Sequence, residues 1–219
     1  MSAPRQEAPG SRAAPLRVGV LISGGGRTAL NLARAARAGE IPAEIALVVV
    51  HRDEAEGIAR CRDAGLRVAV LAPSPDLADR VDRVLGAAGV ELVCLAGYLR
   101  RLRVGSRWAG RAINIHPGLL PRFGGHGMYG LHVHRAVLAA GVAETGCTVH
   151  EVDEEYDRGP TLVERRCAVL AGDTPETLAA RVFDEECRAY PEAIRAIAPR
   201  LIAARTEHRN ESRAEAACL

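Results

Sequence analysis

The chain has 219 residues, which is enough for one well-buried domain and short for two. Its hydrophobic content of 48% is typical of a globular protein, but only 3% of the residues are aromatic, so Ala, Val, Leu and Ile must build the core. The formal net charge of +2 gives no strong nucleic-acid signal, and no apolar run is long enough to span a membrane.

The first half of the chain alternates between two patterns. After residues 1–15, an Ala-, Pro-, Arg- and Ser-rich stretch that we expect to be a disordered tail, continuous apolar runs predict strands and amphipathic stretches predict helices. The predicted strands are Leu16–Ile22, Ala43–Val50, Leu66–Leu71, Glu91–Ala96 and Ala112–Ile115. The predicted helices are Thr28–Ala38, Ala55–Ala64 and Asp76–Ala88. This alternation indicates βαβ units and a parallel sheet, which binds ligands at the carboxyl ends of its strands.

The second half changes character. A glycine-rich segment over residues 123–130 is expected to be a mobile loop, and a helix is expected over Leu131–Ala140. Cys147–Val152 and Thr161–Val169 are predicted to be strands of a hairpin-like pair. The last predicted helix opens at the acidic cap Asp173-Thr174-Pro175-Glu176 and runs to about Ala198.

Together these elements predict one three-layer α/β domain over residues 16–200. Its sheet is expected to be mostly parallel, doubly wound and Rossmann-like, with an antiparallel edge from the C-terminal half. Residues 201–219 lose the helical periodicity and are expected to fray. No pair among the six cysteines has Cys-x-x-Cys spacing, and the N-terminal stretch has no apolar secretory core, which favours reduced thiols and a cytoplasmic protein.

The stretch Asn114–Pro121, Asn-Ile-His-Pro-Gly-Leu-Leu-Pro, carries the strongest chemical signal. Strand alternation places Asn114 and His116 on one side of the extended chain. An amide can donate to a developing oxyanion, and an imidazole can both donate and exchange protons near neutral pH. For Asn-x-His-Pro alone, a polar strand end beside a proline turn is the alternative interpretation.

The segment Ser23–Thr28 links the first strand to the first helix. Its glycines allow backbone N–H groups to approach a phosphate at the start of that helix. The segment lacks the Lys of a Walker loop and the full Gly-x-Gly-x-x-Gly spacing, so a monophosphate is favoured over a triphosphate or a dinucleotide. An ordinary βα turn is the alternative.

Two carboxylates stand out from their surroundings. Asp157 lies in Asp-Arg-Gly-Pro, a sequence that is also good turn chemistry. At about 100° per residue, Glu186 falls in the middle of the apolar face of the last helix, whereas Glu185 falls on the opposite side. A carboxylate on a core-facing stripe is costly unless it is paired or bound, so Glu186 either pairs with an arginine or binds a ligand.

Two clusters of basic side chains raise further alternatives. The first is a group of five histidines within 35 residues, which suggests a possible metal site: His116, His126, His132, His134 and His150. Because His132 and His134 are two residues apart at the start of a helix, they do not face one another, and we expect no metal. The arginines at positions 100, 101, 103, 107 and 111 form either a solvated basic face or a patch that attracts an anionic substrate.

Five segments in order resemble the folate-dependent formyltransferases, whose signature is Asn-x-His-Pro-[Ser/Ala/Gly]-Leu-Leu-Pro. The resemblance runs from about Arg17 to about Pro199 and is greatest to the branch that acts on glycinamide ribonucleotide. Besides the octet, the matching segments are Leu21–Gly26, Leu95–Arg100, Gly146–His150 and Asp157–Pro160.

The resemblance implies a role for each candidate residue. Asn114, His116 and Asp157 would be catalytic, with the aspartate raising the histidine pKa and favouring imidazolium. The ribonucleotide would bind Gly25, Gly26, Arg27, Thr28, Gly97 and Glu186. The folate would bind Leu99, Arg100, Arg101, Leu102, Asn114, Asp153, Glu154 and Glu155. Thr148 and His134 would support the site.

The implied reaction is direct transfer of a formyl group from 10-formyltetrahydrofolate to the amino group of glycinamide ribonucleotide, without metal. The protein would be a monomer or homodimer that binds neither nucleic acid nor membrane. Many members of the family have Ser-Asn where this chain has Arg27-Thr28, and His where it has Cys187. These differences leave open a paralogue that acts on another amine, such as an amino sugar or a secondary-metabolite intermediate. Formyltetrahydrofolate hydrolysis and transfer RNA formylation are disfavoured because they use additional domains, and a nucleotide-binding regulatory module would not explain the catalytic triplet.

Overall fold

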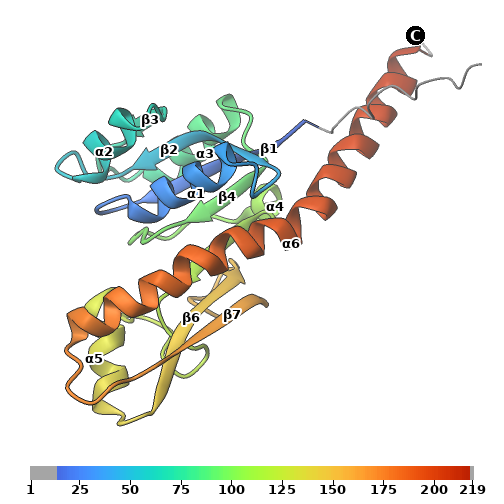
Figure 1. Ribbon diagram of the computed structural model, residues 1–219. Helices are drawn as coiled ribbons and strands as arrows, with labels where there is room; N and C mark the ends of the chain where they lie inside the picture. The colour runs from blue at the N-terminus through green and yellow to red at the C-terminus, as the bar shows by residue number, and fades with distance from the viewer. Residues whose placement is uncertain (1–13, 218–219) are drawn as a thin grey trace, which may run out of the picture.

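The computed structural model describes residues 14–217 as a sheet flanked by helices (Figure 1). The strands are β1 (Leu16–Ile22), β2 (Ala43–Val50), β3 (Val68–Val70), β4 (Leu92–Leu95), β5 (Ala112–His116), β6 (Glu144–Glu151) and β7 (Thr161–Ala168). The helices are α1 (Arg27–Arg37), α2 (Gly57–Asp63), α3 (Leu77–Ala87), α4 (Gly105–Trp108), α5 (Leu131–Ala139) and α6 (Pro175–Ala217).

The seven strands lie in the order β3-β2-β1-β4-β5-β6-β7. Neighbours from β3 to β5 are parallel, whereas β6 is antiparallel to both β5 and β7. The predicted class, a mostly parallel doubly wound sheet with an antiparallel edge in the C-terminal half, is therefore confirmed. The chain moves outward from β1 to β3 and then returns to β4, so β1 and β4 flank the switch point at which such sheets bind ligands.

The central strands are buried on both faces. In β1, Val18 and Val20 pack in the cluster that includes side chains of α1, α5 and α6, whereas Leu21 packs in the cluster under α3 and α4. In β2, Val48 and Val49 divide between the two clusters in the same way. Burial on both faces explains why these strands are continuous apolar runs rather than alternating ones.

Two elements differ from the sequence-based expectation. The short helix α4 was not predicted, because four residues are too few to show a helical period. β6 begins three residues earlier than expected, at Glu144, since Gly146 interrupts the apolar pattern. A glycine is needed there, because a Cβ would lie 1.9 Å from the Arg165 carbonyl oxygen on β7.

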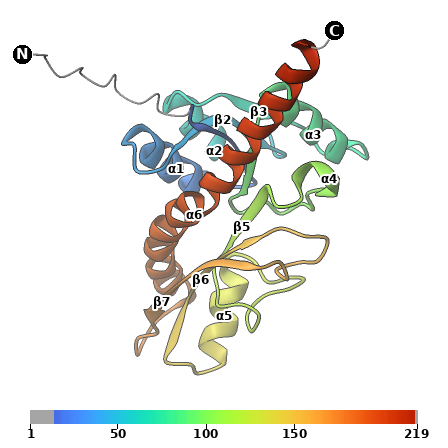
Figure 2. The same cartoon turned by 90° about the vertical axis from the view of Figure 1, so that its right-hand side faces the viewer.

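The helix α6 continues to Ala217, well past the expected end near Ala198, and its last turns project from the body of the domain (Figures 1 and 2). Arg205 anchors this extension, because its guanidinium donates to the carbonyl of Ala14 and pairs with Glu91 at 3.2 Å. The helical structure up to Ala217 differs from the fraying expected after residue 200. The expected disordered tail lies mostly outside the described residues, and the division of the chain into tails and domain stays a prediction.

Candidate active site

A cavity of about 990 Å³ opens at the carboxyl ends of β1, β4 and β5. The predicted site residues that line it are Gly25, Gly26, Arg27, Thr28, Gly97, Leu99, Arg100, Arg101, Leu102, Asn114, His116, His134, Asp153, Glu155, Asp157 and Glu186. Two predicted site residues, Thr148 and Glu154, lie outside this lining. The fold thus gathers segments from both halves of the chain around one space.

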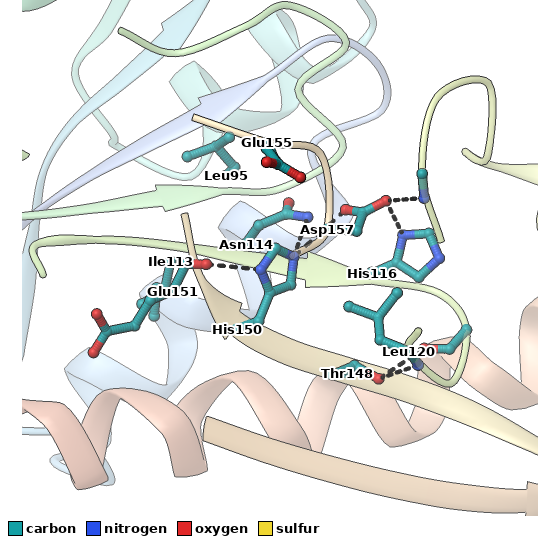
Figure 3. Close-up of polar contacts among 12 residues, drawn as sticks. Leu95, Ile113, Asn114, His116, Leu120, Thr148, His150, Glu151, Glu155 and Asp157 are labelled. Atoms are coloured by element: carbon teal, nitrogen blue, oxygen red, sulfur yellow. Dashed lines mark hydrogen bonds and ion pairs between the residues drawn. The ribbon is translucent and has the colours of Figure 1, made fainter. Parts of the chain in front are cut away.

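The strand β5 presents the two polar side chains of the octet. Asn114 is half-buried and His116 is 3% exposed. Parallel pairing with Leu95 of β4 and antiparallel pairing with His150 of β6 hold Asn114 between two strands. Figure 3 shows the Asp157 carboxylate approaching the His116 ring from a neighbouring loop. The side chains of the predicted catalytic triplet therefore meet in space.

Asp157 is held in place by its backbone and by three polar neighbours. Its φ of 56° lies in the left-handed region, which Asp tolerates better than most residues. Oδ2 accepts a hydrogen bond from Gly125 N–H at 2.9 Å and lies 3.5 Å from His116 Nδ1. Oδ1 lies 3.5 Å from His150 Nε2. Burial acts to raise the Asp157 pKa, but the contacts with His150, with His116 and with the Gly125 N–H together hold it below its usual value, so Asp157 is a carboxylate at neutral pH.

The electrostatics of His116 differ from the expectation. Burial lowers the pKa of this imidazole, and it outweighs the opposing effects of Asp157 and of the Phe123 carbonyl. The expected net rise of the pKa is therefore wrong, although Asp157 does act in the expected direction. Nε2 lies 2.7 Å from the Phe123 carbonyl oxygen and must donate to it, which leaves Nδ1 unprotonated and facing Asp157 in the neutral ring.

His150 is a fourth polar member of this cluster, and the sequence analysis assigned it no role at the site. Its Nδ1 lies 2.8 Å from the Glu151 carbonyl oxygen and donates to it, so Nε2 of the neutral ring accepts from Asn114 Nδ2 at 3.1 Å. This contact fixes the Asn114 amide beside Asp157 (Figure 3). The alternation of Thr148 and His150 along β6 was the available signal, because both face the same side as the β5 residues opposite them.

Thr148 supports the segment after β5 rather than the reacting groups. Its Oγ1 donates to the Gly118 carbonyl at 2.8 Å and accepts from Leu120 N–H at 3.2 Å. These two bonds fasten the proline-flanked turn to β6. The predicted supporting role of Thr148 thus has a physical basis in the position of the turn that follows His116.

The glycine loop follows β1, which β4 separates from β5 in the sheet. Gly26 precedes α1 with a left-handed φ of 72°, and a Cβ there would come within 3.0 Å of the Gly57 backbone. The loop is tied to the neighbouring segment through Ser23, whose Oγ accepts from Leu99 N–H at 2.7 Å and lies 3.2 Å from His51 Nδ1. Neither Ser23 nor His51 was a predicted site residue, yet both line the cavity.

Glu185 and Glu186 point in different directions from the helix α6, as the helical period predicts. Glu186 lines the cavity, and no ion pair to it occurs within residues 14–217, whereas Glu185 lies 2.8 Å from the Arg165 guanidinium. Burial raises the Glu186 pKa to about 7, and the nearby Arg27 opposes this rise. The arginine partner considered for Glu186 therefore belongs to Glu185.

The remaining wall carries apolar and basic side chains. Leu99 is 44% exposed at the cavity, whereas Leu102 is buried beneath it. Arg101 donates to the carbonyl of Glu154 and lies 3.3 Å from its carboxylate. Glu154 thus positions Arg101 from outside the cavity instead of lining it.

The histidines of the possible metal site differ in burial and surroundings. His134 is buried and lines the cavity, with a pKa lowered to about 4 by burial and then by His116. His132 is exposed and contacts Tyr129 edge-on. Across residues 14–217 there is no group of three or more His, Cys, Asp or Glu side chains that could hold a metal ion. Over the same span, no helix combines the length and apolar character needed to cross a membrane.

Comparison with known proteins gives concordant matches. Residues 16–194 match the family described as formyl transferase. A chloroplastic phosphoribosylglycinamide formyltransferase from Arabidopsis thaliana is 40% identical over 202 residues, which are 87% of this chain and 69% of that protein. A trifunctional purine biosynthetic protein adenosine-3 from Gallus gallus is 40% identical over 190 residues, but this chain spans only 18% of it. The crystal structure of glycinamide ribonucleotide transformylase 1 from Symbiobacterium toebii has a TM-score of 0.79 and 39% identity, covering 86% of this chain and 90% of that one.

Proposed function

Because the chain belongs to the formyl transferase family, among the phosphoribosylglycinamide formyltransferases, we propose that it transfers a formyl group from 10-formyltetrahydrofolate to the amino group of N1-(5-phosphoribosyl)glycinamide in de novo purine synthesis. One observation carries the proposal. A single cavity joins a polar cluster suited to a tetrahedral oxyanion with a glycine loop suited to a phosphate.

The two substrates would approach the polar cluster from opposite ends. The ribonucleotide phosphate would lie against the glycine loop at the start of α1, and Glu186 would accept from the ribose hydroxyls. The folate would lie between Leu99–Leu102 and Asp153–Asp157, where an exposed leucine offers an apolar contact. In this arrangement the amine and the formyl carbon would lie between Asn114 and His116.

The chemistry is addition followed by elimination. The amine nitrogen forms a bond to the formyl carbon, and the carbonyl π electrons move to oxygen. Asn114 would donate to that oxyanion from its Nδ2, which requires the amide to turn from His150 Nε2 toward the substrate. The carbon–nitrogen bond to the folate N10 then breaks, which restores the carbonyl on the new amide. No covalent enzyme intermediate is needed.

His116 would carry the proton between the two nitrogens. Its lowered pKa keeps the ring neutral at rest, so Nδ1 can accept the proton that the attacking amine loses, through a water molecule where direct contact is absent. The resulting imidazolium faces the Asp157 carboxylate and the oxyanion, both of which stabilise it. The same proton then passes to the departing folate nitrogen.

Further assignments follow the same proposal. We place the protein in the cytoplasm because the five cysteines of the described chain are all free thiols. The substrates are small molecules, and a monomeric or homodimeric state stays a prediction.

The deciding experiment is a turnover assay with 10-formyltetrahydrofolate against the ribonucleotide and a panel of amines that includes amino sugars. Formylation of another amine with no turnover of the ribonucleotide would contradict the proposal.

A further inference from the structure

Arg27 occupies an electrostatically unfavourable position. It is the first residue of α1, where the helix dipole favours negative charge, and no acidic residue lies in the first turn of this helix. The side chain is exposed, and no hydrogen bond or ion pair of its guanidinium occurs within residues 14–217. Glu186 is near enough for Arg27 to oppose the rise of its pKa, but it forms no ion pair with the guanidinium. A cation placed at this helix end without a paired carboxylate indicates that an anion completes the site.

The Arg27 guanidinium is nevertheless fixed in position. Its Cζ lies 4.0 Å from the centroid of the Phe183 ring on α6, which is a close cation–π contact. Stacking occupies one face of the planar group and leaves the N–H edge available. Both side chains line the cavity together with Gly26 and Glu186. A guanidinium held in this way is a preorganised fork for a planar or tetrahedral anion.

We propose that Phe183 is a positioning residue that holds Arg27 against the substrate phosphate, so that the Arg27–Phe183 pair makes the site selective for a phosphorylated amine over its phosphate-free counterpart. This inference rests on the proposed function and adds to it a residue that acts only through another. Phe183 belongs to α6 and Arg27 to α1, so the contact also joins these two helices.

The first test measures binding without turnover. Calorimetric titration with ribose 5-phosphate and with ribose should show a phosphate preference in the wild type. Arg27→Ala should raise the Kd for ribose 5-phosphate about 10- to 100-fold, as expected for loss of a charged hydrogen bond. Phe183→Leu should raise it about 2- to 5-fold, whereas Phe183→Tyr, which keeps the aromatic face, should stay within about twofold. Arg34→Ala removes the same charge from α1, but two turns away and beside Glu40, and serves as the matched control.

The double variant decides between positioning and direct contact. If Phe183 acts only through Arg27, Phe183→Leu should have no further effect on the Kd in the Arg27→Ala background. In steady-state assays Phe183→Leu alone should raise the ribonucleotide KM and leave kcat and the folate KM unchanged. Equal effects of Phe183→Leu in both backgrounds, or an unchanged Kd with that substitution alone, would overturn the inference. Phosphate selectivity without any formyl transfer would instead refute the proposed function and leave the inference standing.

Discussion

Replacing Glu186 by Gln should make the protein more stable and a poorer binder of the ribonucleotide. The Glu186 carboxyl has a pKa of about 7 in the folded protein, against 4.5 for an ordinary glutamate, chiefly because of burial. At about 1.4 kcal/mol for each unit of pKa, the folded state disfavours the charged form by roughly 3 kcal/mol. Because the pKa is raised in the folded protein, the wild type has its full stability below about pH 4.5. It loses roughly 3 kcal/mol of that stability as the pH rises through 7.

The consequence is a stability difference that depends on pH. Near pH 8, Glu186→Gln should unfold at higher urea concentration than the wild type, with a gain of about 2–3 kcal/mol. Near pH 5 the difference should fall below about 1 kcal/mol, because the folded wild-type carboxyl is then protonated and the pH is only slightly above the 4.5 of the unfolded chain. At pH 8 the ribonucleotide KM should rise several-fold, since a neutral acceptor replaces a charge-assisted one, while the folate KM stays unchanged.

The neighbouring Glu185 provides the matched control. Its carboxylate pairs with Arg165 at 2.8 Å and is 15% exposed, whereas Arg165 is 35% exposed and also pairs with Glu192. Glu185→Gln should therefore lose about 1 kcal/mol at pH 8 and leave both KM values unchanged. A Glu186→Gln protein that is less stable than the wild type at pH 8, with an unaltered ribonucleotide KM, would refute the reasoning.

Three further substitutions test the polar cluster, and a fourth tests the hairpin of β6 and β7. His116→Ala should lower kcat by about 10²–10³-fold with the folate Kd nearly unchanged in equilibrium titration. Asp157→Asn should lower kcat and, because Asp157 raises the His116 pKa, move the pH at which the histidine titrates in the rate profile to lower values. His150→Ala should reduce kcat about tenfold or more while thermal unfolding shows a folded protein. Gly159→Ala should cost more than about 3 kcal/mol in urea unfolding, since its Cβ would lie 1.9 Å from the Glu151 carbonyl oxygen.

Distinct results would contradict each of these expectations. Near-wild-type turnover of His116→Ala would remove it from the chemistry. An unchanged pH–rate profile with lower stability would make Asp157 a turn residue only. A His150→Ala enzyme with full kcat would show that Asn114 needs no partner on β6. Normal stability of the Gly159 variant would mean that the hairpin shifts to admit a side chain.

The fold was predictable because its signals are local and repeated. The strands β1, β2 and β4 are continuous apolar runs that are buried on both faces, and a helical pattern separates the first four predicted strands from one another. The extension of α6 was not predictable in the same way. Its anchor joins Arg205 to Glu91 and Ala14, residues more than a hundred positions away, so no periodicity within residues 201–217 could show it.

The site was only partly predictable. Alternation along β5 was enough to put Asn114 and His116 on one side, but the approach of Asp157 depends on a left-handed turn that the sequence does not specify and was inferred from the family resemblance. His150 was hidden because its role depends on the antiparallel register of β5 and β6, which sets it opposite Asn114. The sign of the His116 shift was missed because a sequence reveals neighbouring charges more readily than depth of burial.

The corrected protonation state suits the proposed reaction better than the expected one. With the pKa values of both His116 and Asp157 lowered, the pair at neutral pH is a neutral imidazole beside a carboxylate, one proton short of an ion pair. The proton it lacks is the one that the amine loses as the new bond forms. Attraction between imidazolium, carboxylate and oxyanion then arises in the tetrahedral intermediate and not in the resting complex. Stabilisation that appears only as the reaction proceeds lowers the barrier, whereas an imidazolium formed in advance would also stabilise the ground state.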